Sequence, residues 1–175
     1  GPVSMAAIAK AAGLSRQTLY LTFADRADLY ISLARRVDEL RGVPAERAKV
    51  EQAPDGVTAI RLMIDMYARL NPAHRAIAHA FDVLRHQDPD AERAWQDRLD
   101  SRRELCATIV DRLAAEGRLR PGVDRETATD IASNLTSFRA WDELVVQCGW
   151  SSDRYRTQIT SLLLLALVGE PVAAS

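Results

Sequence analysis

Two short amphipathic segments joined by a glycine open the chain, and they constrain its fold more than any other feature. Ser4 is a good helix N-cap, and apolar residues recur at helical spacing from there to Ala12. Gly13 predicts a sharp turn, because glycine readily adopts the left-handed backbone conformation. Ser15 predicts the cap of a second helix over residues 16–22. The pattern therefore predicts a helix-turn-helix.

The second of these helices has an apolar inner side and a polar outer side. Leu19 and Phe23 are four residues apart and point inward together. A short helix that is polar outside suits insertion into a DNA major groove, where Arg16 can bind a guanine edge and Gln17 an adenine edge. Residues near the helix ends suit phosphates. The expected DNA-binding residues are Ser4, Ser15, Arg16, Gln17, Thr18, Tyr20, Leu21, Thr22 and Arg26.

This stretch resembles the signature of the TetR (tetracycline-repressor) family. The matching residues, in order, are Ile8 and Ala9, then Ala12 to Ser15, then Thr18 to Tyr20, then Phe23, Arg26 and Leu29. Two positions depart from the family pattern: Arg26 replaces a usual lysine, and Thr22 replaces a common aromatic or histidine. Residues 149–155 also resemble a segment that precedes the last helix in many TetR-type regulators.

The resemblance implies a DNA-reading head of three helices, the first of which would precede Ser4. That helix is not among the residues of this chain, so we expect the chain beginning at Gly1 to bind operator DNA poorly. It also implies that the segment from Ala24 to Gly42 is a connecting helix, whose start would offer Arg26 to a phosphate.

Composition and spacing favour an all-α fold of two domains. Alanine, leucine and arginine dominate, and alternating strand patterns are absent. Gly42-Val43-Pro44 marks the boundary between a DNA-binding domain, residues 1–42, and a helical ligand-binding and dimerisation domain, residues 43–175. Further helices are predicted over residues 45–53, 57–70, 73–87, 91–117, 125–147 and 153–169.

The charge distribution is uneven although the net charge is only −1. Residues 1–41 carry six basic and four acidic groups, and the remainder carries 17 basic and 20 acidic groups. A weakly basic head predicts modest affinity for each DNA half-site. Tight binding would then need two linked heads.

The last predicted helix is apolar on both sides, so both sides need a partner. The economical arrangement packs one side on its own domain and the other on a second copy, which predicts a two-fold homodimer and a palindromic operator in double-stranded DNA. The expected interface residues are Tyr155, Ile159, Leu162, Leu163 and Ala166.

Large adaptable side chains on separate helices of the second domain are typical of an apolar pocket. Asn134, Phe138 and Trp141 share one helix face, which would place one amide beside two aromatic rings. The resemblance implies a mostly apolar or amphipathic small-molecule effector. The candidate pocket residues are Met63, Met66, Tyr67, Phe81, Trp95, Asn134, Phe138 and Trp141.

No pattern indicates an enzyme or a cofactor. The three histidines lack the spacing of a helical zinc site, and no catalytic residues, phosphate-binding loop or metal ligands are predicted. Cys106 and Cys148 lack metal-ligand spacing and are expected to be free thiols in a reducing cytoplasm. The longest apolar run, residues 162–168, is too short to cross a membrane.

We therefore predict a cytoplasmic, homodimeric, ligand-responsive TetR-type transcriptional regulator that is a repressor released from DNA by its effector. Repression and activation would use the same domains, so the sequence leaves both open. A helical protein-interaction adaptor that no longer reads DNA is the alternative from another class, and a helical enzyme would need a polar cluster in a cleft.

Overall fold

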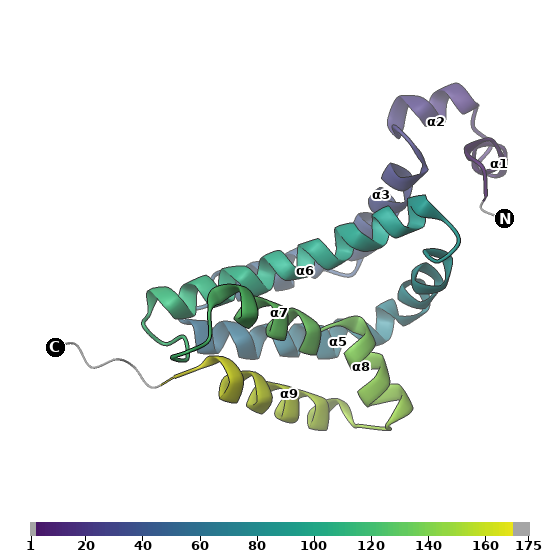
Figure 1. The fold of residues 1–175 in the computed structure, drawn as a ribbon. Helices are drawn as coiled ribbons and strands as arrows, with labels where there is room; N and C mark the ends of the chain where they lie inside the picture. The colour runs from purple at the N-terminus through teal and green to yellow at the C-terminus, as the bar shows by residue number, and fades with distance from the viewer. Residues whose placement is uncertain (1–2, 170–175) are drawn as a thin grey trace. The chain divides into compact units, whose positions relative to one another are not determined.

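A computed structural model describes residues 3–169, and their regular structure is helical (Figure 1). Outside the helices, Leu119 and Val168 form one isolated antiparallel bridge, and the described residues contain no other strand pairing. The predicted all-α fold is confirmed. The elements are α1 (Met5–Ala11), α2 (Arg16–Thr22), α3 (Arg26–Leu40), α4 (Val43–Glu51), α5 (Gly56–Leu84), α6 (Pro89–Ala115), α7 (Arg125–Leu135), α8 (Phe138–Trp141), the π-helix η1 (Asp142–Gln147) and α9 (Ser152–Leu167).

Side-chain caps fix the starts of several helices where the sequence predicted them. The Ser4 hydroxyl accepts from the backbone N–H of Ala7 at 3.2 Å, and Ser15 accepts from Thr18 at 3.0 Å. Such caps satisfy N–H groups that the first turn of a helix leaves without partners. Between them, Gly13 has φ of 68°, the left-handed conformation that the turn requires.

Helix α5 continues through Pro72, where the sequence predicted a break between two helices. Proline removes one intrahelical hydrogen bond and costs about 3 kcal/mol in a helix interior. Burial of Ile60, Met63 and Ile64 on the side of α5 that faces the core favours the helix by roughly 1.5–3 kcal/mol for each side chain. Packing of this kind outweighs the local preference of the Asn71-Pro72 pair.

The single helix predicted over residues 125–147 is instead three elements, α7, α8 and η1. The Thr136 hydroxyl donates to the carbonyl of Ala132 at 2.7 Å, and Ser137 caps α8 by accepting from the N–H of Ala140. Serine and threonine compete with the helical backbone for hydrogen bonds in this way. Apolar residues recur at helical spacing through residues 125–147, so the sequence predicted one continuous helix despite Thr136 and Ser137.

The contacts divide the chain into two compact units. The head unit comprises residues 1–41 and 76–100, and the body unit comprises residues 42–75 and 101–175. The domain boundary expected near residue 42 stays a prediction, since the head unit also includes the turn between α5 and α6.

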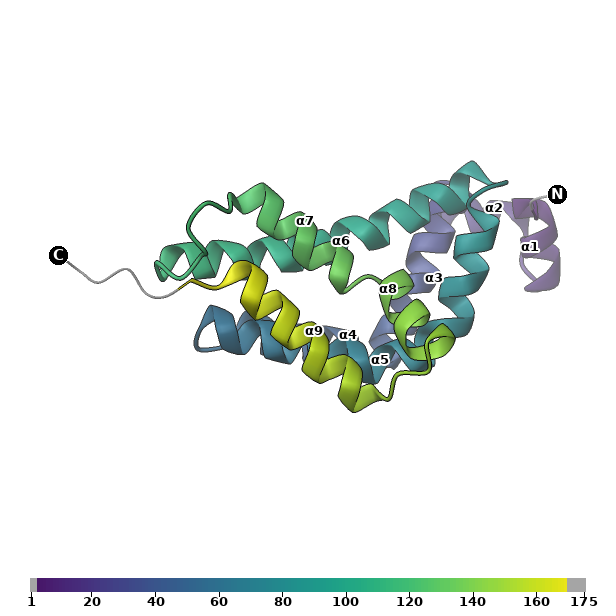
Figure 2. The same cartoon turned by 60° about the horizontal axis from the view of Figure 1, so that its bottom comes forward.

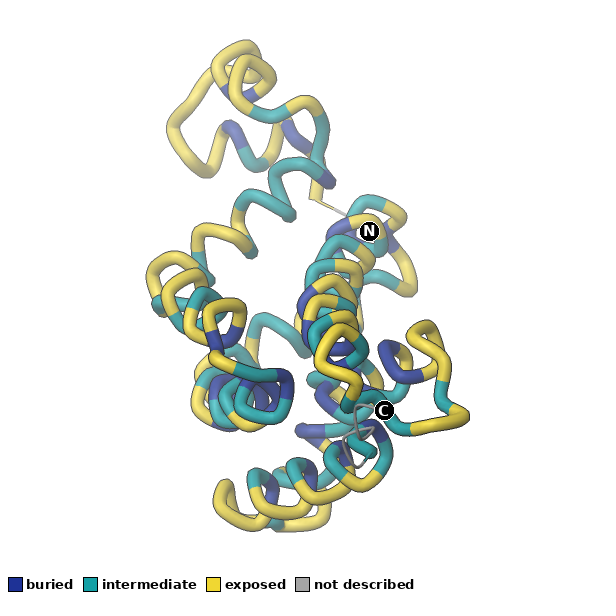
Figure 3. Tube along the Cα trace, turned by 90° about the vertical axis from the view of Figure 1, so that its left-hand side faces the viewer, coloured by how far each residue is buried: buried dark blue, intermediate teal, exposed yellow. Residues whose placement is uncertain are grey.

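Each unit has its own hydrophobic cluster. In the head unit, Met5, Ala9 and Leu19 are buried, with Phe23 packed against them. In the body unit α7 and α9 contact each other (Figure 2), and buried positions recur along one side of the helices (Figure 3). Among the described residues, no helix is long and apolar enough to span a membrane. The largest fully buried apolar side chains of the body are Ile60, Met63, Ile64, Leu105, Leu113, Tyr155, Ile159, Leu163 and Leu167.

Candidate functional site

Helix α2 presents a polar outer surface, as the sequence predicted. Leu19 is buried while Leu21 is 82% exposed, so the helix has distinct inner and outer sides. The Arg16 guanidinium lies 6.0 Å from the centre of the Tyr20 ring, which holds the two side chains together. The exposed outer residues are Arg16, Gln17, Thr18, Tyr20, Leu21 and Thr22.

The hydroxyl groups expected at phosphates already have partners within the head. Besides their capping bonds, Ser15 Oγ and Thr18 Oγ1 lie 2.8 Å apart, and Thr22 Oγ1 donates to the carbonyl of Thr18 at 3.4 Å. Ser4, Ser15, Thr18 and Thr22 are nevertheless exposed. These hydroxyls shape the start and the outer face of α2 and can still accept or donate toward an approaching molecule.

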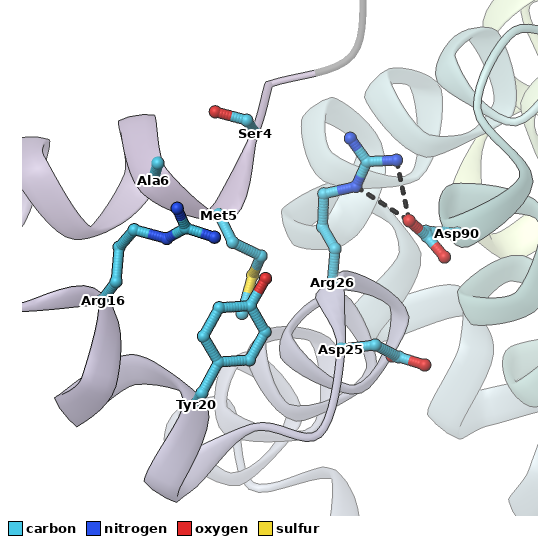
Figure 4. A pocket seen from close by; sticks show the side chains of 8 residues that line it. All are labelled: Ser4, Met5, Ala6, Arg16, Tyr20, Asp25, Arg26 and Asp90. Atoms are coloured by element: carbon cyan, nitrogen blue, oxygen red, sulfur yellow. Dashed lines mark hydrogen bonds and ion pairs between the residues drawn. The ribbon is translucent and has the colours of Figure 1, made fainter.

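Arg26 has a different environment from the one expected for a phosphate contact. Its Nη2 donates to Asp88 Oδ1 at 2.6 Å and to Asp90 Oδ2 at 2.7 Å, and its Nε donates to the same Asp90 oxygen at 3.0 Å (Figure 4). Its Nη1 donates to the carbonyl of Val3 at 2.9 Å. The side chain is only 15% exposed. All three guanidinium nitrogens are therefore engaged by the head unit itself.

The carboxylate of Asp88 is fully buried, so the charge of Arg26 compensates a charge that water cannot reach. Asp88 Oδ1 also accepts from the backbone N–H of Asp90 at 3.0 Å, and its Oδ2 accepts from the Tyr30 hydroxyl at 3.4 Å. Burial by itself lowers the pKa of Arg26, but the Asp90 hydrogen bond and the charge of Asp88 outweigh it and raise that pKa overall. The guanidinium stays charged.

A second ion pair ties the start of α3 to the same part of the head unit. The Arg93 guanidinium donates to Asp25 Oδ2 at 2.7 Å, and this hydrogen bond lowers the pKa of the Asp25 carboxyl. Sequence reasoning missed Asp25, Asp88, Asp90 and Arg93 as partners of this region. The only sequence signal was the Asp88-Pro89-Asp90 break, which indicates a helix start and not a distant cation.

A cavity of about 430 Å³ lies within the head unit, beside these ion pairs (Figure 4). Arg16 and Tyr20 line it from α2, and Arg26 lines it from the start of α3. Both signs of charge occur in its wall, because two carboxylates accompany the two arginines. Its lining residues are Ser4, Met5, Ala6, Arg16, Tyr20, Asp25, Arg26 and Asp90.

The eight residues predicted to line a ligand pocket do not gather in one place. Met63, Met66 and Trp141 are buried in the body core, and Tyr67 and Phe138 pack against that core. Asn134 lies on α7 and is exposed, whereas Phe138 and Trp141 lie on α8, so the three do not share one helix face as expected. The remaining two belong to the head unit, where Phe81 meets Tyr30 edge to face at 5.7 Å and Trp95 lies under Arg85 at 5.3 Å.

The residues predicted for a dimer interface also divide into two sets. Tyr155, Ile159 and Leu163 are each at most 1% exposed within a single chain, so they pack on the body's own core and are unavailable to a partner. Ala166 is half-buried, and Leu162 is 47% exposed. Leu165, at 67%, belongs to the outer side of α9 as well. Because both sides of this helix are apolar, the sequence did not show which side faces inward.

Among residues 3–169, no three histidine, cysteine, aspartate or glutamate side chains lie close enough together to hold a metal ion. Cys106 is buried and Cys148 is exposed, and neither forms a disulfide. The described part of the chain therefore offers a polar surface on α2, an ion-pair network behind it, and an apolar core in the body.

Comparison with known proteins supports both the head and the overall architecture. Residues 1–33 match the sequence model of bacterial regulatory proteins of the tetR family. Search of curated proteins finds no significant match. Among solved structures, the transcriptional regulator FadR from Bacillus subtilis in complex with stearoyl-CoA is similar, with a TM-score of 0.67 and 16% identity over 94% of this chain and 88% of that chain.

Two further solved structures have the same fold. The fatty acid degradation regulator FadR from Bacillus halodurans gives a TM-score of 0.62 and 20% identity, covering 93% of this chain and 84% of that one. The ketosteroid transcriptional regulator KstR2 of Mycobacterium tuberculosis gives 0.58 and 18%, covering 96% of this chain and 86% of its own. These similarities confirm an all-α fold with a helix-turn-helix head.

Proposed function

We propose that this chain is a TetR-type repressor, because its residues 1–33 match the sequence model of the tetR family. In this proposal it binds a palindromic operator as a homodimer. A small apolar or amphipathic effector then releases it from the DNA. The observation that carries the proposal is the exposed polar face of α2 within the matched residues. The apolar core of the body unit, and the similarity of the fold to ligand-responsive regulators, support the proposal that an apolar effector binds.

For DNA recognition we assign the base contacts to Arg16 and Gln17, with Tyr20 and the hydroxyls of α2 at the backbone of the duplex. Arg26 is removed from the proposed phosphate contacts. To reach a phosphate its guanidinium would have to leave Asp88, and a buried carboxylate would lose its counter-charge. Arg26 is instead assigned a positioning role at the start of α3.

For dimerisation we assign the outer side of α9, where Leu162 and Leu165 are exposed. Two large leucines on one exposed stripe are unusual for a surface that contacts only water. A two-fold axis beside α9 would pair this stripe with its copy and present two α2 helices to successive half-sites.

Replacing both Leu162 and Leu165 by glutamate should convert a dimer into a monomer at micromolar concentration, because like charges would face each other across the two-fold axis. The measurement is molar mass by light scattering after size-exclusion chromatography. Leu40→Glu is the control, since Leu40 is 70% exposed in the head unit. A double variant that keeps the mass of a dimer would place the interface elsewhere.

For the effector, the relative named in complex with stearoyl-CoA supports a ligand that joins an apolar chain to a polar group. The body core of this chain offers large, adaptable side chains such as Met63, Met66 and Trp141 to such a molecule. Release of DNA requires that the effector bind more tightly to the form of the protein that does not bind DNA than to the form that does. A shift from 1:99 to 99:1 needs roughly 10⁴-fold preference.

The function is tested by selecting duplexes from a random pool with the purified protein. Enrichment of one palindrome, and its release on adding long-chain acyl-CoA or another apolar effector, would support the proposal. A reporter gene behind the selected palindrome separates repression from activation. Equal binding to all duplexes would favour the adaptor interpretation instead.

A further inference from the structure

Helices α5, α6 and α7 converge on the thiol of Cys106 in the middle of the body unit. The Cys106 Sγ lies 3.9 Å from Met63 Sδ on α5 and 4.0 Å from Oγ1 of Thr136, the C-cap residue of α7. Tyr155, near the start of α9, belongs to the same buried cluster and is 0% exposed. Arg156 of α9 forms an ion pair with Asp65 of α5 at 3.1 Å, although its Nε makes no hydrogen bond.

Several buried side-chain donors of the body unit have no hydrogen-bond acceptor among the residues that the structure describes, including the Nε groups of Arg118, Arg120 and Arg156. The Tyr155 hydroxyl is buried without a partner, and so is the Nε of Arg102 on α6. By contrast the Thr136 hydroxyl is satisfied by the Ala132 carbonyl. Buried donors nearly always have partners, because each one without a partner costs roughly 1–3 kcal/mol.

The positive charge of Arg102 affects the pKa values of both Tyr155 and Cys106. Burial raises the pKa of Tyr155 well above its ordinary value, and the positive charge of Arg102 opposes that shift. Burial likewise raises the pKa of Cys106 to about 11, again opposed first by the Thr136 hydrogen bond and then by Arg102. Arg102 precedes Cys106 by one turn of α6, and Tyr155 belongs to the same buried cluster as Cys106. The thiol and the phenol both stay protonated at neutral pH. Tyr155 is a hydroxyl donor and not an anion.

Three other arginines of the body unit do have acceptors. Arg47 Nη1 donates to the Ser101 carbonyl at 2.9 Å, Arg75 pairs with Asp142 at 2.7 Å, and Arg103 pairs with Asp130 at 2.8 Å. Within residues 3–169, the Nε of Arg102 has no hydrogen-bond partner. A half-buried cation beside a donor hydroxyl suits an acceptor oxygen, most strongly a negatively charged one.

We propose that Tyr155 and Arg102 receive the oxygen of a carboxylate or carbonyl group at one end of the apolar effector. This inference rests on the proposed ligand-responsive function and names its polar subsite. The hydroxyl and the guanidinium hydrogen-bond to that oxygen, and the apolar chain replaces contacts among the neighbouring core side chains. A carboxylate binds more tightly than a carbonyl, because only the carboxylate also neutralises Arg102.

The test measures two properties of Tyr155→Phe and Arg102→Gln in the full chain. Without ligand, Tyr155→Phe should raise the thermal midpoint by about 2–4 °C, since it removes a buried donor that has no partner. Titration calorimetry with dodecanoate should show affinity weakened about tenfold by either substitution. The affinity for methyl dodecanoate should fall in Tyr155→Phe but change little in Arg102→Gln. The affinity for dodecane should change in neither variant.

Arg103→Gln is the matched control, because it removes a neighbouring guanidinium whose partner is an exposed carboxylate; it should leave both affinities unchanged. A lower midpoint for Tyr155→Phe would mean that the hydroxyl is already satisfied, and this would overturn the subsite. Wild-type protein that binds neither dodecanoate nor its ester would overturn the ligand class. Binding that both substitutions leave intact would reject the subsite while the regulator function stands.

Discussion

Replacing Asp88 by alanine should lower the free energy of unfolding by about 3 kcal/mol, one of the two largest effects expected in this chain. Removing one partner of a buried ion pair typically costs 3–5 kcal/mol, because the remaining charge stays buried without compensation. The lower end applies here, since Asp90 still binds Arg26 at 2.7 Å. The substitution also removes the acceptor for the Asp90 N–H at the start of α6. Equilibrium denaturation in urea measures the change.

Asp97→Ala is the matched control for the Asp88 experiment. Asp97 also lies on α6 and pairs with an arginine of α3, Arg35, at 2.8 Å, but that arginine is 64% exposed. Exposed pairs contribute at most about 1 kcal/mol. A double-mutant cycle between Arg26 and Asp88 should then show strong coupling. Equal, small losses for Asp88→Ala and Asp97→Ala would mean that burial of the Asp88 carboxylate does not matter.

Replacing Arg16 by alanine should weaken binding to the selected operator by about 2 kcal/mol for each head, or roughly 30-fold for one half-site. An arginine that binds a guanine edge also contributes specificity, so the variant should tolerate other bases at that position. Gln17→Ala should relax the preference at a different position of the half-site. Competition gel shifts against single-base variants of the operator measure both effects.

Arg26→Ala distinguishes a positioning role from a phosphate contact. With the ion pairs to Asp88 and Asp90 in place, the slope of log affinity against log salt should stay unchanged, while the protein becomes less stable. Arg16→Ala serves as the comparison, because a DNA-facing cation lowers that slope. A slope that falls by about one for each head in Arg26→Ala would restore Arg26 to the phosphate contacts.

The parts of the fold that depend on neighbouring residues were predictable from the sequence. Ser4 and Ser15 cap α1 and α2 because a hydroxyl reaches an N–H three residues ahead, which needs no tertiary contact. Gly13 fixes the turn between them for a similarly local reason. The division of α2 into a buried Leu19 side and an exposed Arg16 side also follows from helical spacing alone.

The parts that depend on distant residues were not predictable. Arg26 and Asp88 are 62 positions apart, and no local pattern links them. Pro72 normally ends a helix, but burial of apolar side chains keeps α5 continuous. On α9 both sides are apolar, so periodicity identified a helix that needs partners without showing that Leu163 faces the core and Leu165 faces outward.

The burial of the Asp88 carboxylate also restricts how relatives of this chain can diverge. A neutral residue at position 26 would leave that carboxylate without compensation, and a neutral residue at position 88 would leave Arg26 with Asp90 alone. Each of these substitutions alone should destabilise the protein. A relative that lacks one of the two charges should therefore also have replaced the other, or carry a compensating charge nearby. In aligned relatives, positions 26 and 88 should therefore covary in charge, while Arg35 and Asp97 drift independently.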